Sequence, residues 1–197
     1  NNIGIGTNAL GGPIAGGEFN VAVGNNALDA LTSGDQTTAL GHNAATRLTT
    51  GSFSTYLGSE AGVQATSASH NVGIGYQSAG SNSASTGNEN TCVGNYAGFK
   101  ITSGASNTII GYDCGFNLTT GSNNIIIGND AGVTGSPGGN ATTDANSIRL
   151  ADENIGAAHI QVDWTVASDQ RDKTDFTALD VGLDFVNALK PYTYKWD

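Results

Sequence analysis

The chain is poor in charge, aromatic side chains, proline, cysteine and methionine. Charged residues make up 12% and aromatic residues 7% of its 197 positions, with three prolines, two cysteines and no methionine. This composition is unusual for a packed globule of that length, and the few prolines without a sustained Gly-X-Y period exclude a collagen triple helix. The sequence also shows no apolar run of membrane-spanning length and no charged-then-apolar leader, so we expect no membrane insertion.

Basic residues are scarce as well. The first 150 positions contain only Arg47, Lys100 and Arg149, and the formal net charge is -10. These are too few cations for a phosphate-binding stripe, so nucleic acid is not expected as a partner. Cys92 and Cys114 lack the spacing of a disulfide framework or a zinc site, and we expect both to be free, buried thiols.

Glycine, in contrast, is abundant and periodic. Of 29 glycines, eight close the same phrase, in which an Asn or small polar residue precedes two small or β-branched residues and an aliphatic one, as in Asn20-Val21-Ala22-Val23-Gly24. The eight lie 17 to 19 residues apart and are Gly6, Gly24, Gly41, Gly58, Gly75, Gly94, Gly111 and Gly128. Self-similarity at a fixed period indicates stacked structural units.

Each unit predicts a coil with two short strands and two glycine turns. The residues before each key glycine are rich in Val, Ile and Thr, which favours a brief strand. A second aliphatic position follows, and after it comes a second glycine turn. The glycines of this turn lie ten residues after the key glycine and are Gly34, Gly51, Gly104 and Gly121, with Gly16 and Gly138 in the same place. About 17 residues per coil predicts an all-β protein of parallel β-roll or β-helix repeats.

Stacked coils turn equivalent positions into rows. We expect the aliphatic row before each key glycine to form the core; it comprises Ile5, Val23, Leu40, Leu57, Ile74, Val93, Ile110 and Ile127. An Asn row is expected to hydrogen-bond from coil to coil or to cap the turn; it comprises Asn2, Asn20, Asn71, Asn90, Asn107 and Asn124. Such a coil has a thin core. A second apolar row and small residues such as Ala27 and Ala44 therefore suggest that chains bury surface against each other, and rod-like fibrous β-proteins suggest by analogy a homotrimer.

The pattern changes after residue 150, which divides the chain into three parts. Residues 1–150 are the repeat shaft, residues 151–167 are expected to form capping or bridging strands, and residues 168–197 belong to another composition class. In the last part, apolar residues from Phe176 to Leu189 recur largely at three and four, which predicts a short amphipathic helix that ends near Pro191.

This last part resembles a known family. It reads Ser168-Asp169-Gln170-Arg171-Asp172-Lys173, then the Leu-rich helix, then Lys190-Pro191 with Tyr194 and Trp196. That order is similar to the start of the intramolecular chaperone domain at the C-terminus of phage tail fibres, tailspikes and endosialidases. The family's domain is longer than thirty residues, and Asn1 lies inside a repeat, so we expect the chain to be a piece of a longer protein with an incomplete chaperone domain.

The resemblance implies single-turnover autoproteolysis. In the family, the domain promotes trimerisation of the fibre ahead of it and then releases itself by cleavage, here between Ser168 and Asp169. Ser168 would be the nucleophile, Lys173 the general base or proton donor, and Arg171 a supporting charge. A hydroxyl is a weak nucleophile until a neighbouring base takes its proton, which is the role that a lysine can fill. No cofactor, metal or external substrate is implied.

The function expected from the sequence is a phage tail fibre protein of the virion, acting outside the cell. Its trimeric shaft would contact a host-cell receptor, either a glycan or a protein. The alternatives are the head of a bacterial trimeric autotransporter adhesin and an ice-binding β-solenoid. Aromatic residues interrupt the repeat and are expected to fill contacts between chains or, as the alternative, to stack on sugars; they are Tyr56, Tyr76, Tyr96, Phe99, Tyr112 and Phe116.

Two further groups of residues are expected to have no ligand role. His42, His70 and His159 are far apart and show no metal-ligand spacing. Asp113 and Asp130 share a slot of the repeat and could form an acidic row that attracts a cation, but the calcium-binding Gly-Gly-x-Gly-x-Asp nonapeptide is absent.

Overall fold

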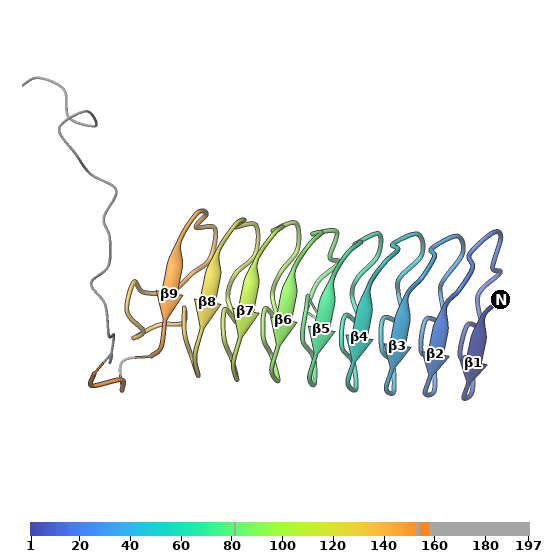
Figure 1. Cartoon of the computed structure of the whole chain (residues 1–197), viewed down its shortest axis with the longest axis horizontal. Coiled ribbons are helices and arrows are strands. Elements are labelled where there is room, and N and C mark those ends of the chain that lie inside the picture. The colour runs from blue at the N-terminus through green and yellow to red at the C-terminus, as the bar shows by residue number, and fades with distance from the viewer. Residues whose placement is uncertain (81, 153, 158–197) are drawn as a thin grey trace, which may run out of the picture. The chain divides into compact units, whose positions relative to one another are not determined.

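The computed structural model describes residues 1–80, 82–152 and 154–157, and Asn1–Ala157 form one compact unit. Within these residues the unit is all-β and contains a nine-stranded parallel sheet whose strands lie side by side in chain order (Figure 1). The strands are β1 (Ile3–Ile5), β2 (Val21–Val23), β3 (Thr38–Leu40), β4 (Thr55–Leu57), β5 (Val72–Ile74), β6 (Thr91–Val93), β7 (Thr108–Ile110), β8 (Ile125–Ile127) and β9 (Ile148–Leu150). The described part of the chain holds no helix long and apolar enough to span a bilayer.

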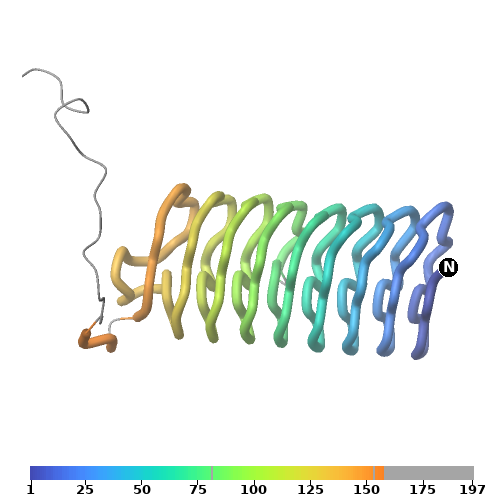
Figure 2. The backbone as a smooth tube through the Cα atoms, in the orientation of Figure 1, coloured from blue at the N-terminus to red at the C-terminus, as the bar shows by residue number. Residues whose placement is uncertain are grey.

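The strands pair in the register that the sequence repeat predicts. Val21 pairs with Thr38, Ala22 with Ala39, and so on from coil to coil, so equivalent residues lie directly above one another. Figure 2 shows the chain returning to the same face after each coil. The last coil is longer, since Asn123 bonds to Asn146, 23 residues on. The prediction of a parallel β-solenoid with about 17 residues per coil is confirmed.

The expectation of two strands per coil is wrong, because each coil of the described residues contributes one strand to the sheet. The opposite side is joined by a narrow ladder, in which the Thr32 N–H donates to Thr49 O at 2.9 Å and the Thr49 N–H donates to Thr66 O at 2.8 Å. The Thr49 hydroxyl adds a bond to Thr66 O at 2.9 Å. This side bends between two turns, so too few consecutive residues pair to make a strand.

The core is formed by the middle residues of β2 to β8 rather than by the aliphatic row before the key glycine. Ala22 and Ile126 are fully buried, whereas Ile5 is 60% and Leu40 is 46% exposed. Side chains alternate along a strand, so in a three-residue strand the first and third point away from the narrow coil and the second points into it. The row predicted as core therefore lies outside.

The rows expected to face other chains lie inside. Ala27 and Ala44, together with the second aliphatic row of Leu31, Leu48, Ile101 and Leu118, are buried within the coil. The small residues permit close packing inside one chain, and the argument that they mediate contact between chains is therefore wrong.

Inside each coil, the inward strand residue and the residue six positions later share the available space. Small Ala22 is followed by Leu28, whereas Tyr56 is followed by Gly62. A Cβ on Gly62 would lie only 2.3 Å from Cε1 of the Tyr56 ring. Gly98, Gly115 and Gly132 in the same way face the larger Cys92, Ile109 and Ile126. The coil interior thus stays filled although no row is uniform.

The glycine turns require glycine for two different reasons. Gly111 has a φ of 140°, and a Cβ there would lie 2.2 Å from Gly128 O in the next coil. In the second turn, Gly34 has no positive φ, but a Cβ would lie 2.2 Å from Gly51 O. The N-terminal member of this second row is Gly17, whose Cβ would approach Gly34 O at 2.7 Å. Gly16 holds that place by residue count only, because the first coil is one residue longer.

The Asn row connects successive coils as predicted. The buried Asn107 side chain donates from Nδ2 to Asn90 Oδ1 and to Gly121 O, both at 2.9 Å. Its Oδ1 accepts the backbone N–H and the Nδ2 of Asn124, both at 3.0 Å. Each Asn therefore satisfies backbone groups of its own coil and of a neighbour, which removes the cost of burying them unpaired.

Candidate functional sites

The most extensive surface feature is the outer sheet face, which we define as the first and third residues of β1 to β9. All eighteen positions are uncharged, and the third residue of every strand is aliphatic. Leu57, Ile110 and Ile127 remain 41%, 38% and 37% exposed. Nine strands at the usual spacing span about 38 Å. An uncharged face of this length with a continuous row of exposed aliphatic residues is typical of a surface that contacts another protein.

An aromatic cluster occupies the turns that follow β5, β6 and β7. Tyr96 meets Tyr76 edge-on at 5.3 Å and Tyr112 at 6.2 Å, and Phe99 stacks on Phe116 with ring centroids 4.8 Å apart. These five residues are the aromatic cluster. They belong to turns rather than strands, so they lie off the outer sheet face, whereas Tyr56 is buried inside its coil.

The Phe116 ring is held in place from two sides. Besides the stack on Phe99, Lys100 Nζ lies 5.0 Å from the centroid of the ring. The same ammonium donates to Asn117 Oδ1 at 2.7 Å. These contacts hold the ring and the neighbouring amide in one orientation.

A cleft of about 270 Å³ opens beside this ring. It is lined by Asp113, Phe116, Asn117, Asp130, Val133 and Thr134. Residues 113–117 follow β7 and residues 130–134 follow β8, and these two strands are neighbours in the sheet (Figure 1). Two successive coils therefore build the cleft from their turns. Its volume is close to the lower end of small-molecule sites.

Two stacked carboxylates form one wall of this cleft. Burial raises the pKa of Asp113, and the negative charge of Asp130 raises it further. Asp113 in turn raises the pKa of Tyr112. The Oδ1 atom of Asp113 is shielded from solvent and has no hydrogen-bond partner among the described residues. A hydrogen bond with the Tyr112 side chain acts in the other direction and lowers the pKa of Asp113, so the repulsion between the two carboxylates is only partly offset.

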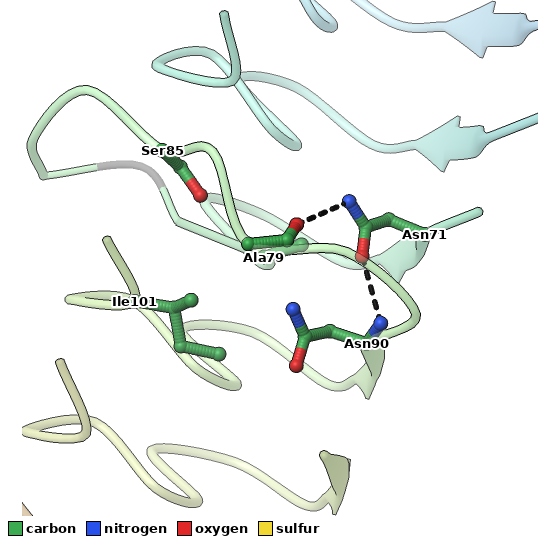
Figure 3. Close-up of a pocket in the computed structure, with 6 residues that line it drawn as sticks. Asn71, Ala79, Ser85, Asn90 and Ile101 are labelled. Carbon is green, nitrogen blue, oxygen red and sulfur yellow. Dashed lines mark hydrogen bonds between the residues drawn. The ribbon is translucent and has the colours of Figure 1, made fainter. Parts of the chain in front are cut away.

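One gap inside the stack, next to β5 and β6, leaves no room for a ligand. The gap between Asn71, Ala79, Ser85, Asn90 and Ile101 is too narrow for a water molecule, and Asn71 Oδ1 there accepts the Asn90 backbone N–H at 2.7 Å (Figure 3). Cys92 and Cys114 are free and buried as predicted, and burial raises the pKa of each thiol to about 12.

The histidines and the predicted catalytic residues do not meet in a described site. His70 stacks on Phe53 at 5.0 Å, and the described residues contain no group of three or more His, Cys, Asp or Glu that could hold a metal. Ser168, Asp169, Arg171 and Lys173, like His159 and the predicted helix, lie outside the described residues. Of the expected bridging segment, the described residues begin with a turn in which the Asn154 N–H donates to Asp152 Oδ1 at 2.9 Å.

Comparison with known families gives one match. Residues 168–197 match the family model for the chaperone of endosialidase. The match begins at Ser168, where the resemblance in the sequence also begins, and that resemblance is confirmed. No curated protein and no solved structure matches the chain. A β-solenoid followed by the start of an endosialidase-type chaperone domain fits a tail fibre shaft with its C-terminal chaperone.

Sequence reasoning missed both surface sites ahead of the chaperone match. The outer sheet face was hidden because its aliphatic row was assigned to the core. A period-two pattern of Val21, Ala22 and Val23, with the smallest residue in the middle, is the signal that could have shown which side is inward. The cleft depends on Val133 and Thr134 in the irregular last coil, where the repeat gives no register.

Proposed function

We propose that the chain is part of a phage tail fibre protein of the virion. Three copies form a stiff shaft that contacts a receptor on the host cell. The C-terminal chaperone domain assists trimerisation and then separates by cleavage between Ser168 and Asp169. The observation that carries this proposal is the uncharged outer sheet face in a chain whose next segment matches the chaperone of endosialidase.

The outer sheet face gives association a driving force. Leu40 and Leu57 are 46% and 41% exposed in the single chain. Since full burial of a leucine contributes about 1.5 to 3 kcal/mol, covering what remains contributes about 0.6 to 1.4 kcal/mol for each. The third residue of every strand adds a contribution of this kind, and a three-fold assembly buries each position three times.

The cleavage chemistry follows from the family motif. Lys173 in its unprotonated form accepts the proton of Ser168 Oγ, and Oγ forms a bond to the carbonyl carbon of Ser168. The bond from that carbon to the Asp169 nitrogen breaks, and this nitrogen takes the proton from Lys173. Water then hydrolyses the ester. Each chain performs this sequence once, and no external substrate is needed.

The test uses a precursor that carries the complete chaperone domain. We expect two bands on a denaturing gel and a native mass of three copies, whereas Ser168→Ala and Lys173→Ala give one uncut band. Lys195→Ala is the matched control and still yields two bands. A single uncut band from the wild-type precursor would contradict the cleavage proposal.

The assembly surface is tested separately by Leu57→Glu. A charge at the centre of an apolar contact is costly to bury, so we expect this variant to give single chains by native mass spectrometry. Ile155→Glu is the control, because Ile155 is 59% exposed and lies outside the sheet. Circular dichroism checks that both variants keep their strands. A trimeric Leu57→Glu protein at the same concentration would refute the assignment of this face.

A further inference from the structure

Three rows that connect successive coils end together at β9, the last strand of the stack (Figure 1). The key glycines from Gly6 to Gly128 have φ values of 123° to 141°, and a Cβ on any of them would lie 2.2 to 2.7 Å from the backbone of the next coil. Ala151 takes the ninth place, and its N–H donates to Ile127 O at 2.7 Å. Its φ is 70°, and it carries a Cβ. A further coil would need the space and the backbone path that only a glycine leaves open.

The core row ends in the same coil. The middle residues of β1 to β8 are uncharged, whereas the middle residue of β9 is Arg149. Its side chain is only 9% exposed, and Nη2 lies 3.5 Å from Asp144 Oδ1. The Nε atom is shielded from solvent and has no hydrogen-bond partner among the described residues. A further coil would place its own inward residue against this guanidinium, and an incompletely paired charge is costly to bury.

The Asn row ends there as well. Ser147 holds its last place, because the Ser147 N–H donates to Asn124 Oδ1 at 3.1 Å. In the coil of β4 the serine of this row, Ser54, accepts the Asn71 N–H of the next coil at 3.1 Å. The Ser147 Oγ instead accepts a hydrogen bond from Nη1 of Arg149. The arginine therefore competes for the acceptor that a further coil would use.

A loop that is specific to the last coil lies against this arginine. The last step of the Asn row spans 23 residues instead of 17. Within the extra residues, the buried Ser136 accepts the Gly132 N–H at 2.9 Å and donates from Oγ to Val133 O at 2.8 Å, which closes the loop on itself. A Cβ on Gly138 of this loop would lie 3.3 Å from Nε of Arg149. The insertion thus supports the residue that ends the core row.

We propose that Arg149, Ala151 and the loop of residues 133–139 terminate the solenoid, so that β9 accepts no further coil, whether from this chain or from a second copy. An open edge strand is a template for pairing with other strands, and stacked repeats need a closing unit at their ends. At the other end of the stack, Gly4 and Gly6 hold the corresponding places, so the closure is specific to β9. It does not depend on trimerisation or cleavage, since every residue involved belongs to the described stack.

The experiment offers the stack one more coil. A copy of residues 112–128, which form one complete coil, is inserted after residue 151 of the full chain, either in the wild-type background or together with Arg149→Ile and Ala151→Gly. The two substitutions restore the residue types of Ile126 and Gly128. Hydrogen exchange is followed by mass spectrometry in peptides that span the junctions of the insert. We expect the insert to exchange about a hundredfold or more slowly in the substituted background than in the wild-type background.

Two further variants with the same insert separate the contributions. Ala151→Gly alone frees the turn but keeps the arginine, so we expect intermediate protection. Arg47→Ile is the matched control, because it removes an arginine whose Nη1 donates to Gln64 Oε1 at 2.7 Å in an exposed position of another coil. Its insert should exchange as fast as in the wild-type background.

Amide exchange of β2 to β8 in every variant checks that the stack itself stays folded. Equal protection of the insert in the wild-type and the doubly substituted backgrounds would overturn the proposal. If both inserts were protected, β9 would accept a coil despite Arg149 and Ala151. If both were unprotected in an intact stack, these two residues would not be what ends it.

Discussion

Asn107 allows the role of the Asn row to be tested with a graded series. Replacement by Ala removes the partners of two buried backbone groups, the carbonyl of Gly121 and the N–H of Asn124. Each unsatisfied buried group costs about 1 to 3 kcal/mol, so we expect Asn107→Ala to lower the free energy of unfolding by about 2 to 6 kcal/mol.

Asn107→Ser should fall between Ala and the wild type. In the coil of β4 the same slot holds Ser54, whose Oγ accepts the Asn71 backbone N–H at 3.1 Å. A serine at 107 can satisfy the Asn124 N–H in the same way, but its short side chain does not reach Gly121 O. The expected loss is therefore about 1 to 3 kcal/mol, from one unsatisfied group instead of two.

The assay is urea denaturation followed by circular dichroism, at one protein concentration because association shifts apparent stability. Asn95→Ala is the control. Its Oδ1 accepts one bond from the Tyr76 N–H at 2.9 Å in an exposed turn, so the expected loss is about 1 kcal/mol or less. If Asn107→Ala is no more destabilising than Asn95→Ala, or if Ser and Ala at 107 are equal, the reasoning about buried backbone groups is refuted.

Two further predictions concern a glycine and a carboxylate. Gly111 has a φ of 140°, and the Cβ of Gly111→Ala would lie only 2.2 Å from Gly128 O. We therefore expect this variant to be destabilised by about 3 kcal/mol or more. Gly156→Ala is the control and should melt like the wild type, because nothing lies within 4 Å of its Cβ. Burial and the charge of Asp130 raise the pKa of Asp113 above 3.8, so the folded state binds this proton more tightly than the unfolded state. The stability of the fold therefore falls as the pH rises above about 3.8 and through the raised pKa of the folded state. Asp113→Asn should therefore raise the melting temperature at pH 7 and leave it unchanged at pH 3, and an equal gain at both pH values would contradict this account.

The fold could be predicted from the repeat, but the repeat did not determine which side of each strand faces the core. A strict period fixes the parallel register and the glycine turns, because any residue with a Cβ at Gly111 or Gly34 would collide with the next coil. The direction of Val23 and Leu40 depends on how narrow the coil is, and an aliphatic residue fits an outer face that is covered by another chain as well as a core. The motif of Ser168 and Lys173 was identified by its resemblance to the chaperone family and lies outside the described residues.

The cleft could not be predicted for a different reason. Asp113 and Asp130 share a slot in the repeat, so their proximity was expected. Their burial and the cavity beside them depend on the inserted residues of the last coil, which follow no period. Tyr56 was also assigned to the wrong place, since a large aromatic residue in a slot of Ala and Gly becomes internal only because Gly62 and Gly73 leave room for it.

The space around Tyr56 also affects which coils can pair with each other. Its ring extends toward the following coil, where a Cβ on Gly73 would lie 3.1 Å from Cδ1 of Tyr56. A chain of near-identical coils can pair out of step during folding, because most strands offer similar partners to their neighbours. The coil of Gly73 has room for this ring, whereas the strand-middle Cys92, Ile109 and Ile126 of later coils are buried, so pairing with one of those coils would place Tyr56 against an occupied interior. The bulky residue thus favours the native pairing of β4 with β5 over pairing with those later coils.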